Sequence, residues 1–204
     1  VVTGVQTCAL PISSIKVHPR YVTGKEPLTD KHEELVSSER PNDFNYGIDK
    51  TKALYLPFDS CYPRVHVLDR GALSVEDKEK LEKECPEGSI DFDMQIDHVK
   101  VNVNSIIIAT GWQPYDATKL DNLGYGRFPN VITNVVMERY ASLSGPTEGK
   151  ILRPSDNEEV KNVAFVQCAG SRDENHLPYC SAVCCMGSLK QARYVREKYP
   201  EANV

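Results

Sequence analysis

The sequence predicts an α/β protein built on parallel strands, and three observations support this prediction. The run Ile106–Gly111 is continuous in β-branched residues and closes on small ones, as strands buried on both faces of a parallel sheet do. A second apolar run, Val160–Gly170, leads through a loop into a helical pattern from about Ser181 to Tyr199. This order of strand, loop and helix is the first half of a βαβ unit of the dinucleotide-binding type.

Upstream of these strands, the clearest element is a helix from Ser74 to Glu84. Ser74 is expected to cap its N-terminus, and Asp77, at the third helical position, is expected to complete a capping-box-like pair. Leu81 is expected to face inward. Alternating or apolar patterns predict short strands elsewhere, at residues 53–56, 64–68 and 99–103, and residues 131–140 predict a short strand and a turn of helix.

Composition and charge exclude several classes of protein. The chain has 204 residues, 40% of them hydrophobic, and a net charge of −5 with basic and acidic residues interleaved. No cationic stripe is present to neutralise a nucleic-acid backbone, so nucleic acid is not expected as a ligand. No run of about 18 apolar residues could span a bilayer. Any membrane association is therefore expected to come through partner subunits. The cysteines are clustered rather than spread through a small loop-rich chain as in a secreted disulfide framework, and no secretory signal is seen, so a cytoplasmic location with reduced thiols is expected.

Both ends of the sequence are expected to be cut. Residues 1–13 lack an initiator Met, resemble translated sequencing-adapter sequence and are predicted to be a non-native leader. The last residues, Glu201–Val204, follow a helical pattern and read as the entry to another strand. The sequence is therefore interpreted as a fragment of a longer protein.

Four of the seven cysteines are concentrated near the C-terminal end. Cys168 closes the second strand, and Cys180, Cys184 and Cys185 fall where the loop enters the helix. A [4Fe–4S] cluster is held by four thiolates, and a loop and a helix start can supply them. Structural zinc, a redox disulfide and buried free thiols remain alternatives, although the adjacent pair of cysteines suits a zinc knuckle badly. The isolated Cys61 and Cys85 are expected to be ordinary thiols.

The loop between strand and helix carries no glycine fingerprint for a phosphate. Gln167–Ser171 stands where a nicotinamide-binding domain would have G-x-G-x-x-G, so a thiolate replaces the phosphate cradle. Four polar residues of this loop could orient it or tune the potential of a cluster, and a solvated loop is an equal alternative. They are Arg172, Asp173, Glu174 and His176.

These segments carry a family resemblance. Residues 165–174, 178–181 and 183–186, together with 107–111, 129–133 and 145–147, resemble the pattern of the heterodisulfide reductase A subunit and its relatives, from about residue 15 to the end. Asn175–Leu177 and Asp116–Lys119 are more similar to the A subunit of the quinone-interacting membrane-bound oxidoreductase complex. The closest resemblance is therefore to that branch.

The resemblance implies a fold, two cofactors and a set of partners. The fold is a thioredoxin-reductase-like flavoprotein with two dinucleotide-binding domains: residues 14–150 are part of the FAD-binding domain, and residues 151–204 begin the second domain with the cysteine cluster. FAD would contact Ala109, Thr110 and Gly111, and a [4Fe–4S] cluster would bind Cys168, Cys180, Cys184 and Cys185. The implied partners are a membrane quinone-reactive subunit and another subunit with flavin and iron–sulfur cofactors.

One departure from the family pattern concerns residues 22–90. Many members carry a ferredoxin-like insertion there with two runs of cluster-binding cysteines, but here only Cys85-Pro86 remains of such a run. A degenerate insertion without clusters is therefore predicted.

Three functions compete at this stage. The leading hypothesis is an oxidoreductase subunit that transfers electrons through FAD and a [4Fe–4S] cluster in a quinone-interacting anaerobic respiratory complex. The first alternative is the A subunit of a CoB–CoM heterodisulfide reductase-like complex. The other is a zinc-stabilised, non-redox interaction module.

Overall fold

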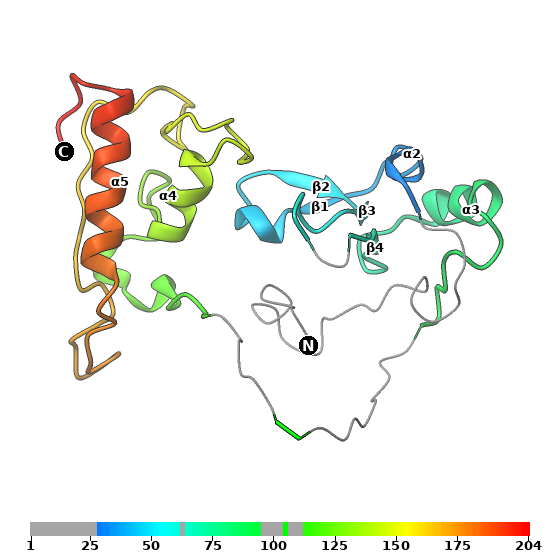
Figure 1. Ribbon diagram of the computed structural model, residues 1–204, viewed down its shortest axis with the longest axis horizontal. Coiled ribbons are helices and arrows are strands. Elements are labelled where there is room, and N and C mark those ends of the chain that lie inside the picture. Colours follow the sequence, from blue (N-terminus) through cyan, green and yellow to red (C-terminus); the bar gives the residue numbers. More distant parts are fainter. Residues whose placement is uncertain (1–27, 62–63, 95–103, 106–111) are drawn as a thin grey trace. The chain divides into compact units, whose positions relative to one another are not determined.

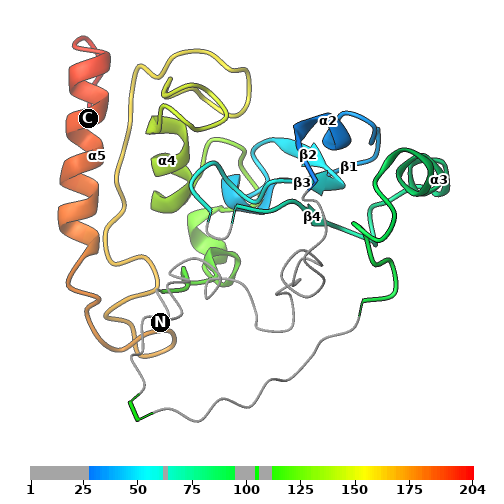
Figure 2. The ribbon, with the colours of Figure 1, turned by 45° about the vertical axis from the view of Figure 1, so that its right-hand side comes forward.

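The computed structural model describes residues 28–61, 64–94, 104–105 and 112–204, which form two compact units (Figures 1 and 2). The N-terminal unit ends at Gln113 and the C-terminal unit begins at Pro114. The leader at residues 1–13 and the strands expected at 99–103 and Ile106–Gly111 lie outside the described residues. Among the residues described, no helix combines the length and the apolar character that crossing a bilayer requires.

The N-terminal unit contains two short antiparallel strand pairs. Strand β1 (Glu39–Pro41) pairs with β2 (Lys50–Lys52), and β3 (Leu54–Tyr55) pairs with β4 (Val67–Leu68). The strands expected at 53–56 and 64–68 are thus present as β3 and β4, although each is only two residues long.

The core of this unit lies between the strands and two helices. Helix α2 (Asp30–Glu33) precedes β1, and helix α3 (Val75–Glu84) follows β4. Burial of apolar side chains from β3, α3 and the adjoining segments is the main stabilising contribution. The buried cluster consists of Leu28, Val36, Ala53, Leu54 and Leu81. Leu81 is 1% exposed, which confirms the inward face predicted for the helix.

Helix α3 begins as predicted, but Asp77 does not complete the capping box that the sequence predicted. The Ser74 hydroxyl accepts a hydrogen bond from the Asp77 backbone N–H at 3.1 Å, which confirms the N-cap. The Asp77 carboxylate does not bond back to Ser74. It is fully buried and accepts hydrogen bonds from the backbone N–H groups of Ser37 and Ser38 and from both hydroxyls. A buried carboxylate needs several donors, and the segment before β1 supplies them.

The C-terminal unit is organised by two packed helices. Helix α4 (Asn134–Ala141) replaces the strand and helix turn expected at 131–140, and α5 (Cys184–Lys198) is the long helix predicted from about 181 to 199. Met137 of α4 and Val195 of α5 form a buried apolar cluster with Ile151 and Ala202, which lie outside the two helices. Gln191, 1% exposed, donates from α5 to the Asn134 carbonyl and to the Glu138 carboxylate on α4, at 2.9 and 2.8 Å.

The segment before the cysteine loop, predicted as a buried strand within Val160–Gly170, is less buried than expected. It forms one parallel bridge, Asn162 with Asn203, in which Val163 donates to the Asn203 carbonyl and Asn203 donates to the Lys161 carbonyl, each at 2.9 Å. Val166 is 65% exposed, so this segment is not covered on both faces, because a single bridge leaves most of its length unpaired within the described residues. The parallel return after α5 nevertheless agrees with a broad α/β class.

Candidate functional site: the cysteine loop

The four clustered cysteines lie at the two ends of one closed loop and on the first turn of α5. Cys168 begins the loop and Cys180 lies near its end, while Cys184 and Cys185 are the first two residues of α5. Cys180 and Cys185 are exposed, and Cys168 and Cys184 are half-buried. All four thiols are free, so each of them is available to bind a ligand.

Backbone hydrogen bonds close the loop on itself. Leu177 donates to the Gly170 carbonyl, Arg172 donates to the Tyr179 carbonyl, and Asp173 donates to the Leu177 carbonyl, each at 3.1 Å. The Ser171 and Ser181 hydroxyls lie 3.2 Å apart at the base. These contacts bring the chain back on itself after Cys168, so that Cys180 and the start of α5 follow directly.

The backbone around the thiols adopts unusual torsions. Cys168, Arg172 and Ala182 have φ angles of 54°, 57° and 60°, in the left-handed region, and none of them is glycine. Each such residue costs on the order of 1–3 kcal/mol, and such strain is concentrated at ligand sites and active sites. The loop is therefore held in a conformation that local preference alone would not select.

Hydrogen-bond donors are directed at the sulfur atoms. The Ala182 backbone N–H donates to Cys180 Sγ at 3.3 Å, and the Arg172 guanidinium donates to Cys168 Sγ at 3.8 Å. The first turn of α5 has no side-chain cap at Val183, so its free N–H groups and positive dipole end lie beside Cys184. The thiolate is the form of cysteine that binds metal, and these donors can hydrogen-bond to it.

The spacing of the four sulfur atoms can be compared with two kinds of metal site. In the described part of the chain, no three of these thiols have their sulfurs within 4.8 Å of one another. Tetrahedral zinc with Zn–S bonds of about 2.3 Å would need sulfurs roughly 3.8 Å apart. In a [4Fe–4S] cube each thiolate binds a different iron, so the four sulfurs are spaced more widely. In this structure, three of these thiols could therefore share one zinc ion only if their sulfurs moved closer together.

Tyr115 is a loop contact that the sequence did not indicate. Its hydroxyl lies 2.6 Å from His176 Nδ1, and the two rings are edge-to-face with centroids 5.8 Å apart. The same Tyr115 ring lies against Gly170, where a Cβ atom would come within 2.7 Å of it. His176 therefore orients the loop, which is one of the two alternatives that the sequence left open, whereas the Asp173 carboxylate accepts the Asn175 N–H within its own turn.

Replacing Gly170 by alanine should destabilise the loop. Gly170 has a φ of +79°, and the new methyl group would meet the Tyr115 ring, so we expect a loss of about 1–3 kcal/mol in the free energy of unfolding, measured by denaturant titration. Gly187→Ala is the matched control, because Gly187 lies in α5 with open space around the position of the new methyl group and should gain about 0.5–1 kcal/mol. Equal effects would contradict the Tyr115 contact.

The residues expected to contact a flavin cannot be placed in this site. Ala109, Thr110 and Gly111 lie outside the described residues. The two sets of candidates therefore differ in what supports them. The structure describes the four thiols, whereas the sequence pattern and the resemblance support the three flavin-contact residues.

Comparison with known proteins gives consistent matches. The chain is 42% identical over 172 residues, 84% of its length, to the A subunit of the H(2):CoB–CoM heterodisulfide, ferredoxin reductase of Methanothermobacter marburgensis. It is 39% identical over 175 residues to the first iron–sulfur A subunit of the CoB–CoM heterodisulfide reductase of Methanopyrus kandleri, again 84% of the chain. Over 189 residues, 91% of the chain, it is 35% identical to the A subunit of the ferredoxin:CoB–CoM heterodisulfide reductase of Methanosarcina mazei.

These relatives are much longer than the chain. It spans 26% of the first two and 24% of the third, about a quarter of their length. No protein-family model matches the sequence. The agreement among the relatives, each of them the A subunit of a heterodisulfide reductase, supports the resemblance seen in the cysteine motifs. Over most of its length, this chain is therefore a homologue of a segment of the heterodisulfide reductase A subunit.

Proposed function

We propose that this chain is part of an electron-transfer subunit of the heterodisulfide reductase A type, and that Cys168, Cys180, Cys184 and Cys185 hold a [4Fe–4S] cluster. The observation that supports this most directly is the closed loop, which returns the chain from Cys168 to Cys180 and the start of α5 with donors directed at two of the sulfurs. The name of one relative, which describes an iron–sulfur subunit, agrees with such a cofactor.

The residues of the loop would stabilise the charge of the bound thiolates. When bound, such a cluster accepts and donates single electrons at a potential set by its surroundings. Arg172 places a positive charge at Cys168, and the Ala182 N–H donates to Cys180. Hydrogen bonds to cluster sulfurs and nearby charge are known ways in which a protein sets that potential. Tyr115 and His176 act on the loop and fix its position.

A flavin contact is the second part of the proposal. Ala109, Thr110 and Gly111 follow the β-branched run that predicts a buried parallel strand, and small residues at the carboxyl end of such a strand allow a nucleotide to approach the backbone. We propose that they contact FAD. The support is the sequence pattern and the resemblance.

The branch of the family and the partners are finer proposals. Asn175–Leu177, Asp116–Lys119 and the loss of cluster ligands in residues 22–90 favour a quinone-interacting complex, whose partners are a membrane quinone-reactive subunit and another subunit with flavin and iron–sulfur cofactors. The names of the three relatives favour a CoB–CoM heterodisulfide reductase-like complex as the alternative. The genes that lie beside the full-length gene would distinguish the two.

Metal analysis tests the proposal against a zinc module. The chain, purified without oxygen, should contain about four irons and as many acid-labile sulfides per molecule and show a broad visible absorption. A colourless sample that holds one zinc ion on the same cysteines would overturn the redox function and support the interaction module. Zinc remains the competitor because the four thiols also suit it chemically.

A further inference from the structure

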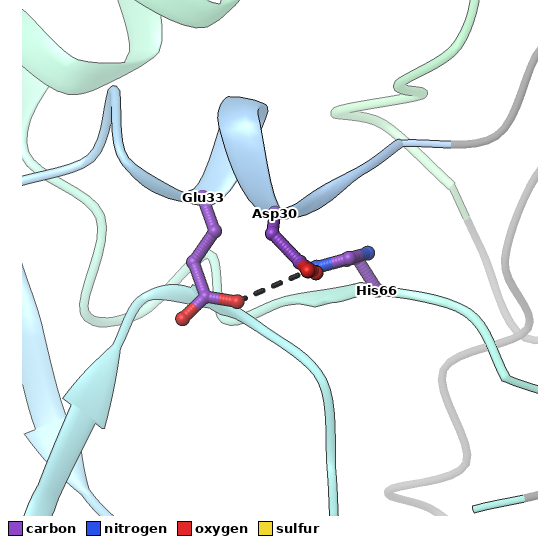
Figure 3. A group of neighbouring side chains, drawn as sticks. All are labelled: Asp30, Glu33 and His66. Carbon is purple, nitrogen blue, oxygen red and sulfur yellow. Dashed lines mark ion pairs between the residues drawn. The ribbon is translucent and has the colours of Figure 1, made fainter. Parts of the chain in front are cut away.

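A second group of possible ligands lies in the N-terminal unit, far along the sequence from the cysteines. Asp30 and Glu33 project from α2, and His66 precedes β4; Figure 3 shows both carboxylates directed at the imidazole ring. One ligand atom from each residue lies within 4.8 Å of the other two. Because His66 is far along the sequence from both acidic residues, folding alone brings the three together.

His66 is the informative member of the group. Its side chain is only 6% exposed, yet its buried Nε2 atom has no hydrogen-bond partner. This atom lies 3.4 Å from Asp30 Oδ1 and 3.4 Å from Glu33 Oε2. Ordinary N–H···O hydrogen bonds are about 2.7–3.2 Å long, so both separations are too long for good ones. A buried nitrogen without a partner is costly and uncommon in folded proteins.

The separations between His66 Nε2 and the two carboxylate oxygens match those between the ligands of a metal ion. Metal–ligand distances to His nitrogen and to carboxylate oxygen are about 2.0–2.2 Å for zinc, and the edge of a tetrahedron with such bonds is roughly 3.4 Å. The Nε2 atom of His66 is at this distance from both oxygens. One imidazole and two carboxylates are also a donor set that suits divalent first-row metals such as zinc, cobalt and iron.

The charges of the group also favour a bound cation. Two carboxylates beside one imidazole bring two negative charges to the group, which one divalent cation would neutralise. Asp30, with a side chain that is 85% exposed, keeps the group open to solvent, so an ion and its remaining water ligands can reach it.

We propose that Asp30, Glu33 and His66 form a binding site for one divalent transition-metal ion of the zinc, cobalt and iron(II) class. The ion links α2 to the segment before β4 and is separate from any metal on the cysteine loop. Its coordination is by nitrogen and oxygen only, in contrast to the thiolates of the C-terminal unit. It contributes to the stability of the N-terminal unit, because a ligand that binds only the folded state stabilises that state.

Cobalt(II) chloride is the probe for this site, used with the full chain. Equilibrium dialysis should show one cobalt ion whose affinity falls at least about tenfold in Asp30→Ala and in Glu33→Gln, because each loses one of three ligands. Glu34→Ala is the matched control, because it removes one negative charge directly after α2 at a residue that is not part of the group. Asp30→His should retain binding, because it replaces one metal ligand by another while removing the negative charge.

Cobalt-edge X-ray absorption separates this ion from cobalt on cysteines. The expected signal is a shell of nitrogen and oxygen at about 2.0–2.2 Å, whereas a sulfur shell near about 2.3 Å would place the metal on the thiols. Asp30→Ala is expected to fold, since the residue is exposed, and circular dichroism would check this. The proposal fails if no cobalt binds, if all variants bind alike, or if Glu34→Ala weakens binding as much as Asp30→Ala.

Discussion

Replacing Cys184 by serine should remove most of the iron from the chain purified without oxygen. Cys184 is the first residue of α5, beside the uncapped N–H groups of that helix, and a cube that loses one of four thiolate ligands is either lost or converted to a smaller cluster. We expect the iron content to fall from about four per chain to below about one. Colorimetric iron and sulfide assays, read with the visible spectrum, measure this change.

The matched control for this prediction is Cys85→Ser. Cys85 follows α3 in the N-terminal unit, is half-buried, and burial together with the charge of Glu84 raises the pKa of its thiol, which disfavours the metal-binding thiolate. Its replacement should leave the iron content unchanged. Equal losses in the two variants would show that the assignment of ligands is wrong.

Replacing Asp77 by alanine should produce the largest loss of stability in the N-terminal unit. The carboxylate is fully buried and joins α3 to the segment before β1 through Ser37 and Ser38, whose backbone N–H groups would lose their acceptor. Removing an ionised hydrogen-bond acceptor of this kind costs about 3 kcal/mol. For a unit of this size the Tm should fall by roughly 12–24 °C in calorimetry.

Glu79→Ala provides the comparison for Asp77→Ala. Glu79 is exposed on the same helix, so its removal should change stability by no more than about 0.5 kcal/mol. A similar decrease in both variants would mean that charge on α3, rather than the buried hydrogen bonds, stabilises the unit.

The pH dependence of stability gives a further expected result for the same residue. Burial alone would raise the pKa of Asp77, but the hydrogen bonds from Ser38 and Ser37 outweigh it and hold the pKa well below its ordinary value of 3.8. The folded state therefore gains stability from Asp77 above the unfolded pKa, and this gain is lost as the pH falls through about 4 and below. Asp77→Asn should lose stability at neutral pH and show a flatter dependence under acid.

Local patterns predicted about half of the helices and strands, whereas α2, β1 and β2 were not predicted. Helix α3 with its Ser74 cap, helix α5 and strands β3 and β4 were all indicated by periodicity and capping residues, because these features depend on neighbours within one or two turns. The same local rule failed for Asp77. The sequence places it where a capping box would have its acidic residue, but its burial depends on Ser37 and Ser38, which are 40 and 39 residues away.

The candidate cluster site was predicted in part for the same reason. The spacing of the cysteines was enough to single out the four thiols as ligand candidates, because that spacing can be seen directly in the sequence. The contacts that close the loop, the left-handed torsion of Cys168 and the bond between Tyr115 and His176 were not predictable, because Tyr115 lies 61 residues from its partner and carries no motif.

The sequence by itself determined the kind of protein: an α/β chain with four thiols at a loop and a helix start, similar over most of its length to a segment of the heterodisulfide reductase A subunit. Only the tertiary structure decided which donors face Cys168 and Cys180, where the Asp77 carboxylate is buried, and that Asp30, Glu33 and His66 meet. The physical reason is that patterns record local preferences, whereas each of these groups depends on chain segments that only packing brings within a few ångströms.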